Sequence, residues 1–200
     1  MRTCPVSGTL PKLLGGKRFV LLHVVRLLRA LICGTKITDA VHANGSYIFL
    51  QLWALGRAAE PPVLKGEGGF DLVAPSPIPL AHSGDGEVAI PRELTVAEIT
   101  EYVHLYSKAA SNAIEAGFDG VEVHAANGYL LDQFLQTVSN ERTDQYGGSI
   151  ENRVRFPLEV INAVVETIGA ERTALRVSPW SKYQGEAYTS RASRVSDAAS

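Results

Sequence analysis

Cysteine is scarce in this sequence, which has Cys4 and Cys33 alone among its 200 residues. Two cysteines are too few for a disulfide-stapled secreted scaffold, and neither stands in a CxxC or cysteine–histidine spacing that would indicate zinc. An excess of either charge is also lacking, because the formal net charge is −2. A near-neutral charge argues against general nucleic-acid binding, which needs a basic surface. The 46% of hydrophobic residues and 20% of charged residues are an ordinary globular balance, which excludes disorder throughout.

Acidic residues are absent before Asp39, whereas this first segment carries seven basic residues. Its apolar stretch, 19–33, is interrupted by His23, Arg26 and Arg29, which argues against a membrane span and against a secretory signal. Two interpretations remain. The segment has the composition of an Arg-rich mitochondrial presequence, or it does not belong to the fold that follows. We favour the second and expect a cytoplasmic protein, with a mitochondrial location as the alternative.

Strand-like and helix-like segments alternate along the chain. Three short apolar segments are predicted to be strands, and the first has the continuous apolar character of a strand buried on both faces of a parallel sheet. The predicted strands are 46–53, 120–124 and 173–177. Helical spacing, capping residues and terminal glycines predict the helices. The predicted helices are the end of one at 36–43, then 95–116, 129–135 and 150–168.

Local signals define several of these boundaries. Thr95 and Glu98 have the spacing of a capping box, and Ser149 is expected to cap the last helix. Pro157 lies inside that helix and is expected to kink or split it, because proline lacks a backbone N–H. Residues 56–93 are rich in Gly and Pro and show no clear periodicity. They are expected to form a long surface loop, or a loop that contains a hairpin.

The order of elements predicts βα units joined by right-handed crossovers, in either a (β/α) barrel or an open doubly wound sheet. No GxGxxG motif follows a predicted strand, so the dinucleotide-binding fingerprint is absent. Polar residues stand at the strand ends instead, namely Gln51 and Trp53, His124 and Asn127, and Arg176. Polar chemistry at several strand ends is typical of a barrel enzyme. We therefore expect parallel, adjacent strands with Gln51, His124 and Arg176 at one end.

His124, Asn127 and Tyr129 form a candidate catalytic group. His and Asn side chains both donate hydrogen bonds, and two donors on one oxygen would polarise a carbonyl or nitro group. The Tyr129 phenol could deliver a proton nearby. The alternative is that His124 is a hydrogen-bonded histidine of the barrel and that Tyr129 packs a helix.

Longer strings around these residues narrow the interpretation. They are VEVHAANGYLLDQFL at 121–135 and NERTDQYGGSIENR at 140–153, with QLW at 51–53 and LRVSP at 175–179. Together they closely resemble the old yellow enzyme family, which consists of flavin-dependent ene-reductases on a (β/α)₈ barrel. The resemblance covers residues 36 to about 184, and the string WALGR at 53–57 looks most like fungal members.

The resemblance implies FMN as cofactor and NADPH or NADH as reductant. Gln51 corresponds to the side chain that binds the pyrimidine edge of the flavin. An amide suits this role because it can both donate hydrogen bonds to the carbonyl groups of that ring and accept one from its N–H. Arg176 corresponds to the cation beside the flavin N1–C2=O group, where positive charge stabilises the reduced ring. Arg142 and Arg153 also belong to the family motif, and we interpret them as structural ion-pair residues.

The resemblance also implies a small-molecule enone as substrate. His124 and Asn127 correspond to the pair that holds the oxygen of the substrate, and Tyr129 to the acid that protonates carbon. Trp53 corresponds to a wall of the active site, or simply packs the barrel. No nucleic acid or membrane partner is expected, and the sequence leaves the physiological enone, the choice of nicotinamide and the oligomeric state open.

The chain departs from the family in length, since members are about twice as long and a barrel has eight strands. We expect a partial (β/α)₈ TIM barrel of about three to four βα units at 36–185. On this view 1–35 is a basic segment foreign to the family, and 186–200 is a disordered tail. Two hypotheses follow: an FMN-dependent oxidoreductase, or a non-catalytic truncated fragment that cannot hold FMN stably because strand edges are exposed and the phosphate site is missing.

Overall fold

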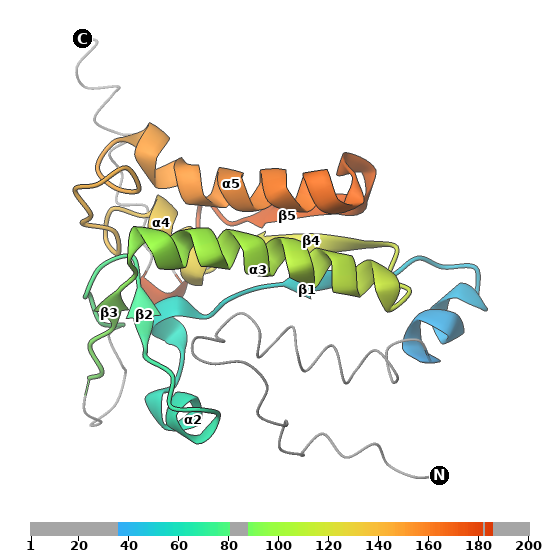
Figure 1. Ribbon diagram of the computed structural model, residues 1–200, viewed down its shortest axis with the longest axis horizontal. Helices are drawn as coiled ribbons and strands as arrows, with labels where there is room; N and C mark the ends of the chain where they lie inside the picture. The colour runs from blue at the N-terminus through green and yellow to red at the C-terminus, as the bar shows by residue number, and fades with distance from the viewer. Residues whose placement is uncertain (1–35, 81–87, 182, 186–200) are drawn as a thin grey trace.

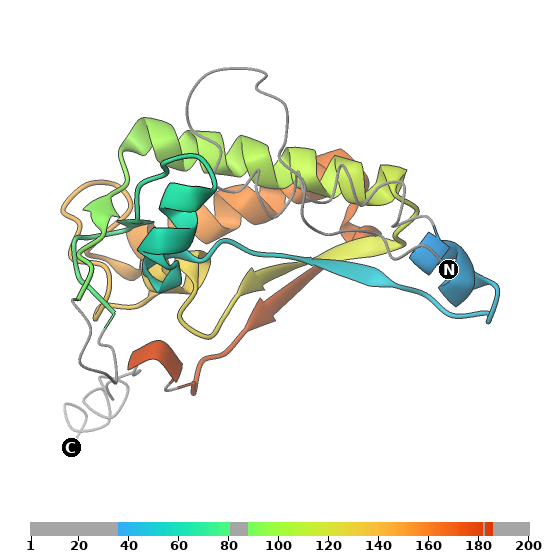
Figure 2. The ribbon, with the colours of Figure 1, turned by 90° about the horizontal axis from the view of Figure 1, so that it is seen from below.

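The computed structural model describes residues 36–80, 88–181 and 183–185, which form an α/β structure (Figure 1). A parallel sheet forms one layer. Helices α3 (Val96–Glu115) and α5 (Ile150–Ile168) lie side by side on one face of this sheet, as Figures 1 and 2 both show. The expectations for 1–35 and 186–200 concern residues outside those described.

The sheet has three parallel strands in the order β1-β4-β5, with β4 in the centre. The strands are β1 (Phe49–Leu52), β4 (Gly120–Ala125) and β5 (Thr173–Val177). Gln51 of β1 pairs with Glu122 of β4, and His124 of β4 pairs with Arg176 of β5. The predicted parallel and adjacent strands are therefore confirmed.

Local capping chemistry defines the two long helices. The Thr95 hydroxyl accepts a hydrogen bond from the Glu98 N–H, and the Glu98 carboxylate accepts from the Thr95 N–H, which completes the predicted capping box of α3. Ser149 caps α5 through the N–H of Asn152.

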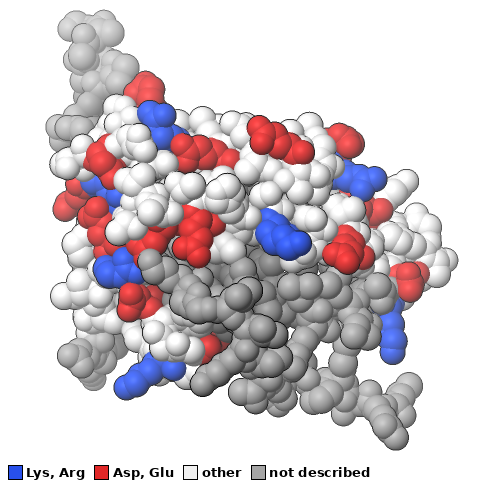
Figure 3. All heavy atoms as spheres, in the orientation of Figure 1, with Lys and Arg blue, Asp and Glu red and all other residues white. Residues whose placement is uncertain are grey.

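Among the described residues, neither these helices nor any other is long and apolar enough to cross a membrane. Acidic and basic side chains are interspersed over the face that carries α3 and α5 (Figure 3).

The hydrophobic core lies between the sheet and the two helices. Side chains of a strand alternate between its faces, so every second residue of β4 points toward the helices. The fully buried residues at this contact include Val121 and Val123 of β4, Tyr106 of α3, and Phe156 and Val160 of α5. The intervening residues of β4 lie on the opposite face of the sheet, and that face holds the candidate site.

Residues 56–93 contain more regular structure than the expected surface loop. They include η1 (Gly56–Ala58) and α2 (Pro61–Gly66), and β2 (Val73–Ala74) pairs with β3 (Arg92–Glu93). This pairing is parallel, so the expectation of a hairpin was wrong. A hairpin reverses direction in a tight turn, whereas the long connection here lets the chain return in the same direction.

The expected interruption at Pro157 does not split α5, which runs as one helix from Ile150 to Ile168. Proline removes one N–H donor, here the partner of the Arg153 carbonyl, but its fixed φ is compatible with helical backbone. Pro157 is buried next to Phe156, which has no exposed surface. Burial of this apolar face offsets the loss of one helical hydrogen bond.

Candidate active site

The predicted flavin and substrate residues lie at the carboxyl ends of the three parallel strands. Gln51, His124 and Arg176 come from β1, β4 and β5 in turn, and the register of the parallel strands places all three in the carboxyl-terminal half of the sheet. The three strands run side by side in Figure 2. The side chains of these three residues lie on one face of the sheet, and the helices α3 and α5 cover the other face. This end of a parallel sheet is where barrel enzymes place their active sites.

Glu122 joins the two predicted flavin-binding side chains. The Gln51 amide donates from Nε2 to Glu122 Oε1 at 2.6 Å. Arg176 donates from Nε to the same oxygen at 2.8 Å and from Nη2 to Oε2 at 2.9 Å, which is a bidentate pair. The hydrogen bond from Arg176 is the largest cause that holds the pKa of Glu122 below its usual range, and Gln51 adds to it. The cluster therefore carries an ionised carboxylate between an amide and a guanidinium.

Three aromatic rings meet beside this cluster. The Trp53 and Tyr129 ring centroids are 4.5 Å apart with planes at 88°, and His124 lies 5.3 Å from Tyr129 and 6.2 Å from Trp53. Edge-to-face contacts of this kind are favourable. Trp53 therefore packs directly on the two predicted catalytic rings, which agrees with the wall role and does not exclude the packing role.

His124 is 4% exposed, and its Nδ1 atom has no hydrogen-bond partner among the described residues. Burial, followed by the positive charge of Arg176, lowers the pKa of His124 below its ordinary value. Burial also raises the pKa of the Tyr129 phenol. At neutral pH the site thus holds a neutral imidazole and a protonated phenol. The alternative of a histidine with every ring nitrogen bonded inside the barrel does not match the unpartnered Nδ1 atom.

A tight turn places Asn127 after β4. Asn127 has a left-handed backbone with φ of 57°, and its N–H donates to the Ser178 hydroxyl at 2.7 Å. The next N–H, of Gly128, donates to Asp132 Oδ2 at 2.8 Å. Burial raises the pKa of Asp132, and two hydrogen bonds oppose that effect. Ser178 and Asp132 therefore fix the turn that carries Asn127 from two directions.

Sequence reasoning missed Glu122, Ser178 and Asp132. Glu122 stands two residues before His124 on a strand, so the period of two already placed it on the same face. Ser178 follows Arg176 at the end of β5 and offered a similar signal. Asp132 offered none that we can identify, because its role depends on the shape of the turn before α4 (Leu130–Leu135).

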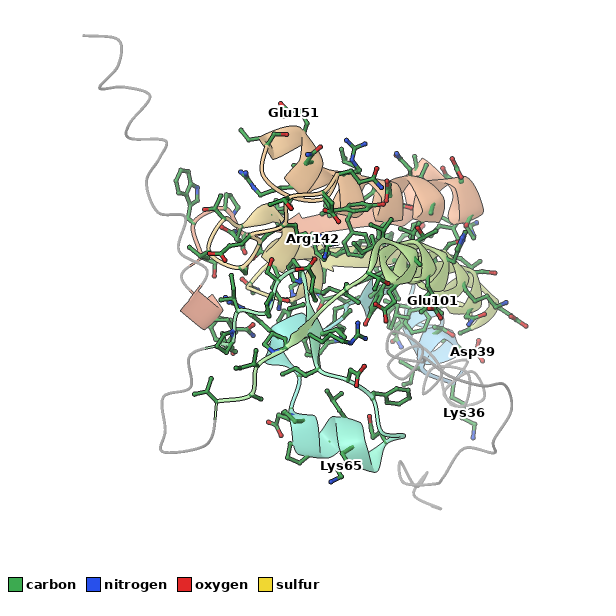
Figure 4. All side chains as sticks on the ribbon, turned by 60° about the vertical axis from the view of Figure 1, so that its left-hand side comes forward. Lys36, Asp39, Lys65, Glu101, Arg142 and Glu151 are labelled. Atoms are coloured by element: carbon green, nitrogen blue, oxygen red, sulfur yellow. The ribbon has the colours of Figure 1, made fainter. Side chains whose placement is uncertain are left out.

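Arg142 has the expected structural role. Its side chain is 2% exposed and pairs with Asp144 at 2.5 Å and Glu93 at 3.1 Å. It lies among other side chains inside the molecule in Figure 4, whereas Glu151 points outward. Arg153 donates to the main-chain carbonyls of Leu135 and Gly148, which is a structural role. Among the described residues these carbonyl contacts stand in place of the ion pair expected for it.

A parallel βα sheet with polar residues at its carboxyl edge is the arrangement of a TIM-barrel enzyme. Residues 33–196 match the family model described as the NADH:flavin oxidoreductase / NADH oxidase family. The chain belongs to this family and is a member of its old yellow enzyme group. The resemblance predicted from the four sequence strings is therefore confirmed.

Individual relatives agree with this assignment. The chain is 55% identical over 150 residues to chanoclavine-I aldehyde reductase fgaOx3 of Penicillium roqueforti, covering 75% of this chain and 40% of that protein. It is 49% identical over 161 residues to a probable flavin mononucleotide-dependent alkene reductase of Leishmania infantum, covering 76% and 44%. The crystal structure of Old Yellow Enzyme from Pichia sp. AKU4542 aligns with a TM-score of 0.73 at 46% identity, covering 79% of this chain and 42% of that one.

The chain thus spans about two fifths of the length of the curated relatives it matches. The fold is a partial (β/α)₈ barrel, with three of the barrel strands in the described residues. The predicted fold class is therefore confirmed as part of a TIM barrel.

Proposed function

We propose that this chain carries the cofactor and substrate centre of an FMN-dependent oxidoreductase that uses NADPH or NADH. On this proposal the enzyme reduces the C=C bond of an α,β-unsaturated carbonyl. The observation that carries it is the meeting of Gln51, His124 and Arg176 at one edge of the sheet. The printed name of the Leishmania infantum relative, a probable flavin mononucleotide-dependent alkene reductase, supports reduction of a C=C bond. The name of the Penicillium roqueforti relative supports a reductase but gives an aldehyde as its substrate.

The residues present fit the polar edge of a flavin ring. Gln51 and Arg176 are both exposed on the face of the sheet away from α3 and α5, and they offer an amide and a cation within one hydrogen-bonded cluster. These two side chains would hold the pyrimidine edge and the N1–C2=O group of FMN. When bound, FMN supplies the hydride that it has taken from the nicotinamide.

His124 and Asn127 would hold the oxygen of the substrate. Because the pKa of His124 is lowered, its imidazole is neutral at pH 7 and one ring nitrogen carries a proton to donate. The second donor, the amide of Asn127, is placed by the turn that Ser178 and Asp132 fix. Two donors on one oxygen draw electrons from the conjugated C=C bond and favour hydride addition.

Tyr129 would supply the proton that completes the reduction. Burial raises the pKa of the phenol, so the group is fully protonated at neutral pH. Its contacts with Trp53 and His124 hold the ring beside the oxygen-binding pair. A positioned acid of this kind donates its proton to the carbon of the C=C bond that does not receive the hydride.

Anaerobic reduction of the FMN-loaded chain tests the proposal. Addition of NADPH should bleach the flavin absorbance, and a simple enone such as cyclohexenone should restore it. A chain that binds FMN and bleaches but is not reoxidised by any enone would refute the substrate class. A chain whose bound FMN is not bleached by either nicotinamide would refute the oxidoreductase proposal.

A second candidate is a non-catalytic fragment that does not retain FMN. It is favoured by the exposure of apolar residues on β5 and beyond, where Leu175 is 49%, Val177 is 55% and Trp180 is 86% exposed. In a complete barrel the neighbouring strands and helices would cover such residues. Colour discriminates between the candidates, because a purified chain that is colourless after incubation with excess FMN and removal of the unbound FMN supports the fragment.

The proposal also includes a cytoplasmic location and small-molecule partners alone. The interspersed surface charges and the formal net charge of −2 support the absence of a nucleic-acid partner. Fractionation of cells that express a tagged chain tests the location, and recovery in the mitochondrial fraction would contradict it.

A further inference from the structure

Glu122 lies on the central strand, on the face of the sheet away from α3 and α5, and the roles proposed above do not include it. Its carboxylate receives three hydrogen bonds that cross the whole sheet, from Gln51 on β1 and from Arg176 on β5. The Glu122 side chain is 23% exposed and that of Arg176 is 53% exposed. One acid on the central strand therefore ties together side chains from both flanking strands.

The chemistry of this contact determines the orientation of the Gln51 amide. An ionised carboxylate only accepts hydrogen bonds, so it must face the NH₂ group of the amide and not its oxygen. The other edge of the amide, with the acceptor oxygen Oε1, is then left for a ligand. An unrestrained glutamine would present either edge, because its terminal torsion is broad.

The same contact selects which part of Arg176 is available. Nε and Nη2 are both engaged by the two oxygens of Glu122 in the bidentate geometry that guanidinium and carboxylate prefer. The remaining nitrogen, Nη1, is left to a ligand. The carboxylate thus restrains a long side chain that is more than half exposed and would otherwise sample many rotamers.

We propose that Glu122 is a positioning residue, which sets the Gln51 amide and the Arg176 guanidinium in the orientation that receives the polar edge of FMN. This inference rests on the proposed function and deepens it. Glu122 itself acts through its two neighbours. Its loss should therefore alter both side chains at once and weaken cofactor binding without unfolding the sheet.

Nuclear magnetic resonance of the full chain without FMN tests the first half of the proposal. In the unsubstituted chain, the Gln51 NH₂ and the Arg176 Nε–H should give separate, slowly exchanging signals. In Glu122→Gln both groups should show the chemical shifts and the hydrogen exchange rates of solvent-exposed, unbonded side chains. Unchanged signals of either group in Glu122→Gln would overturn the proposal.

Glu98→Gln provides a matched control, because Glu98 at the start of α3 also makes a bidentate pair with an arginine, here through Nη1 and Nη2 of Arg92. This variant should change the signals of Arg92 and leave those of Gln51 and Arg176 in place. Glu122→Asp is the second variant, used also if Glu122→Gln does not fold. Its shorter carboxylate keeps the charge but should lose the contact with Gln51.

Equilibrium titration with FMN tests the second half. Loss of the charged hydrogen bonds should weaken FMN binding by about 10- to 100-fold in Glu122→Gln, with no change in Glu98→Gln. Equal affinity in Glu122→Gln and the unsubstituted chain would overturn the positioning role. If the unsubstituted chain binds no FMN, the proposed function fails for this chain, and the resonance comparison still decides whether Glu122 orients its neighbours.

Discussion

His124 shows how one buried side chain links stability to pH. Its imidazole is almost completely buried, and burial lowers its pKa in the folded chain below the ordinary value of about 6.5. The unfolded chain therefore binds a proton more readily than the folded chain. As pH falls below about 6.5, the free energy of unfolding should decrease, and His124→Gln should remove this part of the decrease.

Urea unfolding at a series of pH values between about 5.5 and 7.5 measures this effect. His104→Gln is the control, since His104 is exposed on α3 and its variant should keep the pH dependence of the unsubstituted chain. An identical slope in His124→Gln and in His104→Gln would show that His124 is not held neutral by the fold.

Tyr129 separates the two half-reactions of the proposed enzyme. In a chimera that joins residues 36–185 to the remaining barrel strands of a relative, Tyr129→Phe should leave flavin reduction by NADPH intact. It should slow enone reduction by about 10²- to 10⁴-fold, because only that half-reaction needs a proton on carbon. Stopped-flow measurement of each half-reaction separates these outcomes. Equal slowing of both would make the phenol a structural residue.

The site residues could be predicted where a polar residue stands near the end of an apolar strand. Gln51, His124 and Arg176 each stand at the end of an apolar strand, and this position alone placed them together. Glu122 was overlooked because a charged residue inside a strand draws attention only when its partners on neighbouring strands are known. Asn127-Gly128 is a typical turn dipeptide with left-handed backbone, but the sequence does not specify that the Asp132 carboxylate would bind the N–H of Gly128 in that turn.

At the scale of elements, Arg142 holds the loop after α4 against the β2–β3 pair. Its Nη1 atom donates to the carbonyls of Pro75 and Leu94, and its other nitrogens bind Asp144. Arg142→Met would leave these buried carbonyls without their donor. We expect a loss of about 3 kcal/mol in the free energy of unfolding, measured by chemical denaturation.

Arg155→Met is the corresponding control on α5. Arg155 donates to the Gln145 carbonyl at 2.8 Å and to Asn152 in a more exposed setting. Its replacement should cost less than about 1 kcal/mol. A loss for Arg142→Met no larger than that for Arg155→Met would mean that the buried network contributes little to holding this loop.

The elements themselves were predictable to different degrees. The starts of α3 and α5 depend on residues within one helical turn, namely Thr95 with Glu98 and Ser149, so local sequence defined them. The parallel pairing of β2 with β3 depends on contacts between distant residues, which no local pattern encodes. Pro157 shows the same limit, because the sequence alone does not show that this residue is buried within an unbroken α5.

At the scale of the molecule, the helices among the described residues cover one face of the sheet. Its helix-bearing face is packed with apolar side chains, and its other face carries the charged cluster of Gln51, Glu122 and Arg176. A partly exposed polar cluster adds little to stability by itself, because exposed ion pairs are weak. Its arrangement across three strands is better explained by a ligand that binds there, and FMN is the ligand that the family assignment indicates.

Equilibrium titration of the purified chain with FMN tests this account most directly. The account predicts saturable binding of one FMN per chain, which is measured by the change in flavin fluorescence. Binding should be lost in the double variant Gln51→Ala/Arg176→Ala and retained in the control Arg155→Met. Absence of saturable binding in the unsubstituted chain, or equal binding by the double variant, would contradict the claim that this edge of the sheet is a flavin site.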